Sequence, residues 1–182
     1  MKQIAVVGTG YVGLVTGTCF AETGNRVTCI DIDAQKVEKM KQGQIPIYEP
    51  ELDVLFERNI KAGRLHFTTD LAAGIQDAEI IFLALPTPPG EDGSADLSYI
   101  LGVADQLGKL LTDYKVIIDK STVPVGTAER VHAAIAANAK VPFAVVSNPE
   151  FLREGYAVAD FMKPDRVVIG CSDERAAKIM ES

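Results

Sequence analysis

Short apolar runs rich in β-branched residues alternate with helix-length periodic segments along the 182-residue chain. The runs predict strands, and the longer segments between them predict helices. The expected strands are residues 4–7, 27–31, 65–68, 79–85, 115–119, 143–146 and 166–170. The expected helices are residues 14–23, 34–42, 51–62, 97–112, 124–139 and 173–182. This alternation is typical of an α/β fold with a mainly parallel, doubly wound sheet and helices on both faces.

Boundary residues support several of these limits. Proline is favoured in the first turn of a helix, an Asp or Ser at the N-cap, and glycine just after the helix end. The residues that suit these positions are Pro50 and Pro124 for first turns, Asp96 and Ser172 for N-caps, and Gly24 and Gly63 for helix ends. The stretch PTPPGEDGSA, residues 86–95, predicts an extended loop.

The stretch VVGTGYVGL, residues 6–14, places three glycines directly after the first apolar run. Gly8, Gly10 and Gly13 have the spacing G-x-G-x-x-G, which alone is a weak signal. Here a strand precedes the motif, a helix follows it, and the next strand ends at Asp31. This context predicts a Rossmann-type dinucleotide site, in which Gly8 permits the turn, Gly10 admits a pyrophosphate and Gly13 lets the helix approach the sheet. A glycine turn without a ligand is the alternative.

Asp31 is expected to accept hydrogen bonds from the adenosine ribose of that dinucleotide. Its negative charge would repel a 2′-phosphate, so the sequence favours NAD over NADP. The pyrophosphate would bind free N–H groups at the positive end of the first helix.

Unusual loops follow five of the predicted strands: the glycine loop, DIDAQK, PTPPG, KSTVPVGT and NPEFLREG. Ligands of open α/β sheets bind beyond the carboxyl ends of the strands. We therefore expect one cleft at this edge, bordered by Gly10, Asp31, Thr87, Thr122 and Glu154.

Together, GTGYVGL, DIDAQKV, PTPPGEDGSAD, KSTVPVGT and NPEFLREGYAVADFMKPDRVVIG resemble the NAD-binding half of the nucleotide-sugar dehydrogenases, over nearly the whole chain. The resemblance implies a parent enzyme that oxidises the C6 alcohol of UDP-glucose to the carboxylate of UDP-glucuronate with two NAD, through a cysteine thioester. UDP-N-acetylmannosamine and GDP-mannose are alternative substrates, although PEFLREG followed by DFMKPDR favours UDP-glucose. A non-catalytic NAD(H)-sensing module is the alternative of another class.

The resemblance also assigns roles position by position. The expected cofactor-binding residues are Gly8, Gly10, Tyr11, Val12, Gly13, Asp31, Lys36, Thr87, Thr122 and Glu154. The expected substrate-binding residues are Glu150, Phe151, Leu152, Arg153 and Glu154. The expected catalytic residues are Thr122, Glu150 and Glu154, with Thr122 and Glu150 orienting water or relaying protons. The alternatives are that Thr122 satisfies backbone groups at a helix start, and that Glu150 and Glu154 lie on a solvated helix turn.

The cysteines do not match the nucleophile of this family. Cys19 and Cys29 fall within a helix and a strand, so both are expected to be buried. Cys171 ends a predicted strand with no histidine or basic neighbour to lower its pKa. The family's glycine-rich cysteine motif, its substrate-side lysine and asparagine, and a second phosphate-binding loop are not found in the sequence. We therefore expect a truncated chain, with residues 1–182 forming one NAD-binding domain.

The remaining features narrow the class of protein. The net charge of −7 disfavours broad binding to nucleic acid or anionic membranes. No apolar stretch approaches the ~20 residues that cross a bilayer, and residues 1–7 do not resemble a signal peptide, so a cytoplasmic location is expected. Three cysteines at no ligand spacing favour neither disulfides nor a metal site.

Three further expectations concern assembly and single motifs. A homo-oligomer is expected, formed through the C-terminal part that the family carries. His66 and His132 have no partner cluster in the sequence and are expected to be structural. GEDGSAD is expected to be a plain turn, because its spacing differs from that of a calcium-binding loop.

Overall fold

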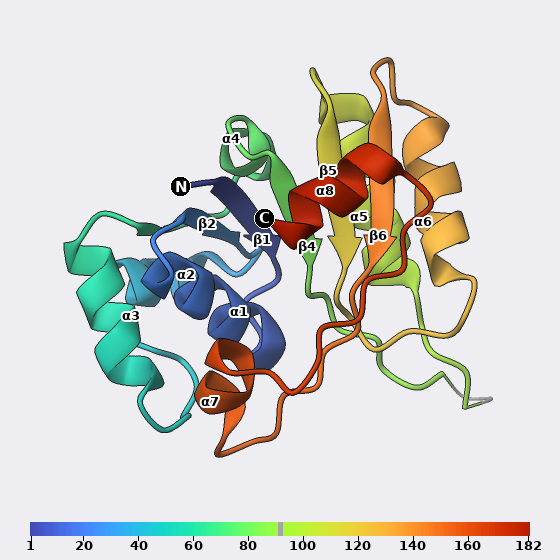
Figure 1. Ribbon diagram of the computed structural model, residues 1–182. Helices are drawn as coiled ribbons and strands as arrows, with labels where there is room; N and C mark the ends of the chain where they lie inside the picture. Colours follow the sequence, from blue (N-terminus) through green and yellow to red (C-terminus); the bar gives the residue numbers. More distant parts are fainter. Residues whose placement is uncertain (91–92) are drawn as a thin grey trace.

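The central strands of the sheet are apolar along their length because helices cover both faces. The computed structural model describes residues 1–90 and 93–182 (Figure 1). Its strands are β1 (Gln3–Val7), β2 (Arg26–Ile30), β3 (Leu65–Thr68), β4 (Ile80–Leu83), β5 (Lys115–Asp119) and β6 (Phe143–Ser147). They form one parallel sheet in the order β3-β2-β1-β4-β5-β6. This is the Rossmann strand order, which confirms the predicted fold class.

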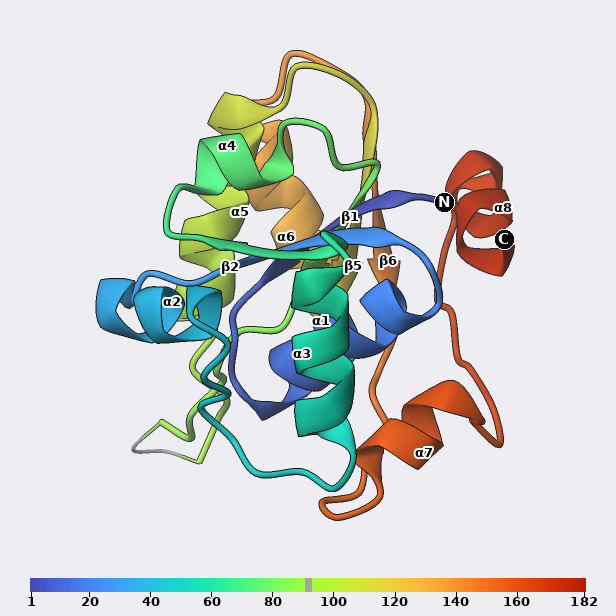
Figure 2. The ribbon, with the colours of Figure 1, turned by 90° about the vertical axis from the view of Figure 1, so that its left-hand side faces the viewer.

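Helices cover both faces of this sheet (Figure 2). One face carries α1 (Tyr11–Glu22), α2 (Ala34–Lys41), α3 (Leu52–Lys61) and α8 (Glu174–Glu181). The other carries α4 (Leu71–Ile75), α5 (Ser98–Leu110) and α6 (Thr127–Ala136). The short helix α7 (Ala157–Met162) packs on α1 rather than on the sheet.

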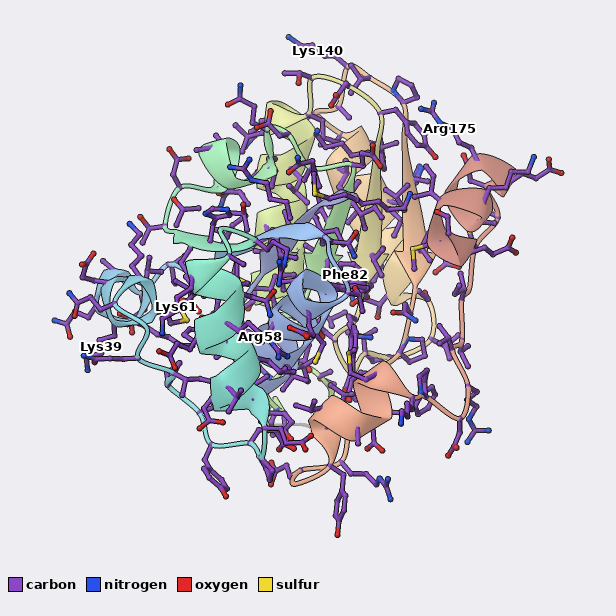
Figure 3. The ribbon with its side chains drawn as sticks, turned by 60° about the vertical axis from the view of Figure 1, so that its left-hand side comes forward. Lys39, Arg58, Lys61, Phe82, Lys140 and Arg175 are labelled. Carbon is purple, nitrogen blue, oxygen red and sulfur yellow. The ribbon has the colours of Figure 1, made fainter. Side chains whose placement is uncertain are left out.

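The helix α1 lies over the middle of its face of the sheet. Its Phe20 ring centroid is 5.0 Å from that of Phe82 on β4 and 4.9 Å from that of Phe161 on α7. Phe82 accordingly lies near the centre of the molecule (Figure 3). The chain reverses its direction of winding between β1 and β4, so the carboxyl ends of these two strands form the topological switch point where ligands bind in such sheets.

The predicted strand at residues 166–170 is wrong. Within the described residues, the segment joins β6 only through an antiparallel bridge between Ser147 and Gly170. Val167 and Val168 are 62% and 41% exposed. The β-branched pattern favoured a strand, but a strand also needs a partner along its length, and this segment meets β6 only at its last residue.

Several predicted helix limits are also wrong. The N-caps of α3, α5, α6 and α8 are Glu51, Leu97, Gly126 and Asp173. Pro50 and Pro124 therefore precede their helices. Asp96 makes a local turn by accepting the Ser98 N–H, and Ser172 is displaced as cap by Asp173, which accepts the Ala176 N–H at 2.8 Å.

Other limits follow local geometry. Gly24 and Gly63 end α1 and α3 in left-handed conformations, with φ of 94° and 68°, which confirms their predicted positions. The helix α1 begins at Tyr11, three residues earlier than predicted, because it starts inside the glycine motif. The helices α4 and α7 were not predicted, since five and six residues are too few for a periodic signal.

The contact between α5 and α6 depends on a missing side chain. A Cβ added at Gly108 would lie 2.3 Å from the Ile135 carbonyl oxygen, whereas one added at Gly102, on the same helix, would meet nothing within 4 Å. We expect Gly108→Ala to lower the free energy of unfolding by about 1–3 kcal/mol through overpacking. Gly102→Ala should raise it by about 0.5–1 kcal/mol through helix propensity. Urea denaturation followed by circular dichroism measures both, and similar effects of the two variants would contradict the packing argument.

Candidate functional site

The turn after β1 lies against the backbone at the end of β4. Gly8 has a φ of +99°, and its N–H donates to the Ile30 carbonyl at 2.8 Å. A Cβ at Gly8 would lie 2.2 Å from the Ala84 carbonyl oxygen, and a Cβ at Gly13 would lie 2.0 Å from the Gly8 carbonyl oxygen. Neither position has room for a side chain, so both glycines are required for α1 to begin this close to the sheet.

Gly10, between them, is exposed and faces open space. It is the N-cap of α1, with nothing within 4 Å of the position of an added Cβ. Among the described residues, no side chain caps this end of the helix. The first turn of α1 therefore presents uncapped N–H groups at the positive end of the helix dipole, which suits an anion.

The Asp31 carboxylate, just after β2, is held by several donors. Oδ2 accepts the Thr9 hydroxyl and, at 3.1 Å, the Thr9 N–H. Oδ1 accepts the Asp33 N–H at 3.0 Å, and Lys36 Nζ lies 3.3 Å from Oδ2. Burial alone would raise the pKa of Asp31, but these hydrogen bonds and the Lys36 charge outweigh it and lower that pKa. Asp31 is therefore an anion beside the glycine loop.

Thr9 is a residue that the sequence did not single out. It occupies a variable position of the glycine motif, yet it is fully buried and bonds Asp31 through both its hydroxyl and its N–H. A small hydroxyl residue in that position is compatible with many roles, and only the fold brings it to Asp31.

The loops after β4 and β5 are tied together. The Thr87 hydroxyl donates to the Thr122 carbonyl at 2.9 Å. The Leu85 N–H donates to Ser121 Oγ at 3.0 Å. Because α6 begins at Thr127, Thr122 does not lie at the helix start where its alternative role was placed.

Residues 149–156, in the loop between β6 and α7, are irregular, so the carboxylates of this 149–156 loop do not lie on a helix turn. Glu150 Oε2 accepts the Leu152 N–H at 2.7 Å. The Arg153 guanidinium already has a partner within the chain, because it donates to both oxygens of Asp160 at 2.7 and 3.0 Å. Phe151 is 52% exposed, and Glu154 is also exposed.

A second missed residue, Glu49, joins this loop to α1. Its side chain is nearly buried and accepts the Tyr11 hydroxyl at 2.5 Å and the Gly155 and Ala157 N–H groups at 2.9 Å each. Burial raises the pKa of the Tyr11 hydroxyl, and the Glu49 charge raises it further. The stretch IYEPEL, which contains Glu49, looks like an ordinary segment before a helix, so nothing in the sequence marks Glu49 as a site residue.

Buried polar residues also follow β5 and β6. Lys120 Nζ donates to Asn148 Oδ1 at 3.1 Å, and burial lowers the Lys120 pKa to about 8. Asp119 is 2% exposed, and within the described chain its Oδ2 atom has no hydrogen-bond partner. Burial raises the Asp119 pKa to about 6, against the Ser121 N–H, which lowers it. The sequence signal that could have identified Asp119, Lys120 and Asn148 is their position at the ends of apolar strands.

These loops come together because the carboxyl ends of parallel strands share one edge of the sheet. In Figure 1 the arrowheads of β5 and β6 point toward the end of the molecule where α7 lies. Hydrogen bonds join the loop after β1 with that after β2, and the loop after β4 with that after β5. Glu49 links α1 to the 149–156 loop by accepting from Tyr11 and from the Gly155 N–H. That Gly10, Asp31, Thr87, Thr122 and Glu154 border one cleft stays a prediction.

The remaining thiols and imidazoles are used in packing. Burial raises the pKa of Cys19 and of Cys29 to about 12. The Cys171 thiol donates to the Asp173 carbonyl. The His66 Nε2 atom lies 2.9 Å from the Gly63 carbonyl oxygen, and the His132 ring is 4.8 Å from that of Phe143.

The described residues, 1–90 and 93–182, lack two features. They contain no group of three or more His, Cys, Asp or Glu side chains that could hold a metal. None of their helices combines the length and apolar character that a membrane span requires. The predicted GEDGSAD turn includes Glu91 and Asp92, which lie outside the described residues.

The amino-acid sequence of the chain is similar to those of known proteins. Residues 2–182 match the sequence model of the UDP-glucose/GDP-mannose dehydrogenase family, NAD binding domain. The chain is 52% identical to the UDP-glucose 6-dehydrogenase TuaD of Bacillus subtilis (strain 168) over 183 aligned residues, which are all of this chain and 40% of that protein. It therefore spans less than half the length of this relative.

Two solved structures are also similar to the chain. A UDP-glucose dehydrogenase from the hyperthermophilic archaeon Pyrobaculum islandicum superposes with a TM-score of 0.96 at 43% identity, covering 99% of this chain and 43% of the other. A GDP-mannose dehydrogenase from Pseudomonas aeruginosa superposes with a TM-score of 0.90 at 33% identity, covering 100% of this chain and 43% of the other.

The raised pKa of Asp119 predicts a pH-dependent stability. Between about pH 4 and pH 6 the folded chain keeps a proton on Asp119 that the unfolded chain, with a pKa of about 3.9, has released. This contribution is complete below pH 4 and is lost as the pH rises through 6. The stability of the parent relative to Asp119→Asn should therefore fall between pH 4 and 6 and level off above it. Urea denaturation across this range measures the difference, and a constant difference would contradict the burial argument.

Proposed function

The chain belongs to the UDP-glucose/GDP-mannose dehydrogenase family, whose NAD-binding domain it matches, and on this basis we propose that the glycine loop, Asp31 and Lys36 hold NAD. The observation that carries the proposal is the Asp31 anion beside an uncapped helix start. A ribose supplies hydroxyl donors to such a carboxylate, and a pyrophosphate suits the positive helix end.

The residues present fit such a dinucleotide. Gly8 and Gly13 bring α1 close to the sheet, and Gly10 leaves its surface open. Tyr11 and Val12 contribute backbone N–H groups from the first turn. When bound, NAD supplies the hydride acceptor that a dehydrogenase needs. Two hydroxyls of a ribose would share the Asp31 oxygens with Thr9, or replace the Lys36 contact there.

We place the nicotinamide side of the site at the loops after β4, β5 and β6. Thr87 and Thr122 line it from two bonded loops, and Glu154 approaches it from the 149–156 loop. Glu150 and Thr122 orient water or relay protons, roles that suit a carboxylate and a hydroxyl. Phe151, Leu152 and Arg153 form the substrate side of the same loop, where Arg153 is oriented by Asp160.

For the longer protein we propose oxidation of UDP-glucose to UDP-glucuronate, with residues 1–182 as its NAD-binding domain. The greater identity to the enzymes named for UDP-glucose than to the GDP-mannose dehydrogenase, 52% and 43% against 33%, supports this substrate over GDP-mannose. UDP-N-acetylmannosamine is a further alternative. Homo-oligomeric assembly through the rest of the protein and a cytoplasmic location are part of the same proposal.

Replacing Asp31 tests the cofactor assignment. We expect Asp31→Ala to weaken NAD binding about 10- to 100-fold, because a hydrogen bond to a charged group contributes roughly 1.5–3 kcal/mol. The parent should bind NAD more tightly than NADP. Titration calorimetry measures both affinities.

Asp33→Ala is the matched control for this test. Asp33 caps α2 by accepting the Lys36 N–H at 3.0 Å, so its loss should cost about 1 kcal/mol of stability and leave NAD affinity nearly unchanged. Unchanged NAD affinity in Asp31→Ala, or equal affinities of the parent for NAD and NADP, would refute the role of Asp31.

We further expect the 182-residue chain to bind NAD without oxidising UDP-glucose. A thioester route needs a thiolate, and burial keeps Cys19 and Cys29 protonated at neutral pH by raising their pKa to about 12. The test is NADH absorbance with UDP-glucose and NAD at saturation, alongside a thermal shift with NAD alone. Steady turnover that disappears in Cys171→Ala would overturn this expectation and make Cys171 the nucleophile.

A further inference from the structure

Glu49 connects three segments that are distant in sequence. Its two oxygens accept the hydroxyl of Tyr11, the first residue of α1, and the N–H groups of Gly155, in the 149–156 loop, and of Ala157, the first residue of α7. The separations along the chain are 38, 106 and 108 residues. In Figures 1 and 2 the loop before α3, the start of α1 and the start of α7 lie at the same end of the molecule.

A buried carboxylate is unfavourable unless donors replace its water. Glu49 is 4% exposed. Burial alone would raise its pKa, but the Tyr11 hydroxyl and the two N–H groups outweigh it and lower that pKa. The charge is therefore present, and charge-assisted hydrogen bonds of this kind are stronger than neutral ones.

From this geometry we propose that Glu49 is a positioning residue that fixes the 149–156 loop to the first turn of α1. Ligand binding at the glycine loop then changes the mobility of the 149–156 loop through Glu49. Oε2 accepts both the Tyr11 hydroxyl and the Gly155 N–H. A shift of Tyr11 therefore acts on the same oxygen atom that holds the loop. The second half of the proposal, transmission from the ligand, rests on the proposed binding of NAD.

Glu22 provides a contrast within the same layer. It also joins distant segments, through Arg58 at 2.6 Å and Asn59 at 2.7 Å, both on α3. Figure 3 shows Arg58 on the α3 helix. None of the hydrogen bonds of Glu22 in the described structure reaches the 149–156 loop. Glu22→Gln therefore removes a bracing carboxylate without touching the proposed connection.

Amide hydrogen exchange without NAD tests the first half. Glu49→Gln keeps the size of the side chain but turns one acceptor oxygen into an NH₂ group, which cannot accept the donors that face it. We expect exchange at Gly155 or Ala157 to become roughly 10- to 100-fold faster, with a smaller change at the Val6 amide in the sheet. In Glu22→Gln the exchange at Gly155 and Ala157 should follow that at Val6. An equal acceleration of all three amides in Glu49→Gln would mean general destabilisation and would overturn the proposal.

Tyr11→Phe tests transmission. This variant removes the link to α1 but keeps both N–H bonds to Glu49, so exchange at Gly155 and Ala157 without NAD should stay near that of the parent. Saturating NAD should slow exchange at Gly155 in the parent, and this response should be lost in Tyr11→Phe, even at concentrations that calorimetry shows to be saturating for the variant.

The possible outcomes separate the two proposals. An NAD response that persists in Tyr11→Phe, or that is missing in the parent although NAD binds, would overturn transmission through Glu49. Failure of NAD to bind the parent at all would overturn the proposed function, and the exchange comparison without NAD would still decide whether Glu49 positions the loop.

Discussion

The structure depends on the close approach of the first turn to β4. Gly8 and Gly13 let α1 start directly over the end of β1, with no room for a side chain between Gly8 and the Ala84 backbone. A single methyl group at Gly8 would have to displace the end of β4. Because β1 and β4 are neighbours at the switch point, that displacement would also move the strands on either side. The same contact that makes the sheet compact exposes the N–H groups of α1 at its edge.

The polar residues at this edge show how a fold of net charge −7 can accommodate an anion. Two carboxylates lie beside the start of α1, and either could repel a phosphate. Asp31 is already engaged by Thr9 and Lys36, and Glu49 by Tyr11 and two backbone N–H groups. The Lys36 ammonium thus offsets the Asp31 charge, and the hydroxyl and N–H dipoles that Glu49 accepts weaken the repulsion it exerts at the helix start.

Features with a local signal could be predicted from the sequence, whereas features that depend on contacts between distant segments were missed. The six strands of the sheet, the glycine turn and the buried cysteines each have a local signal, in β-branched runs, spacing or apolar neighbours. The segment at residues 166–170 has the same local signal, but whether it forms a strand depends on β6, which offers it one bridge. Thr9 and Glu49 look unremarkable because their partners are 22 to 108 residues away.

The buried pair at the end of β5 extends this reasoning to the proposed reaction site. Asp119 and Lys120 follow an apolar strand, and burial moves the pKa of one up to about 6 and the other down to about 8. Both shifts bring a side chain toward the pH range where proton transfer is efficient, next in sequence to Ser121 and Thr122. The Lys120 ammonium is held by Asn148, two residues before Glu150. The ends of β5 and β6 therefore set the electrostatic environment of the proton-transfer groups proposed for this edge. The dinucleotide is proposed to bind elsewhere along it, where β1 and β2 end.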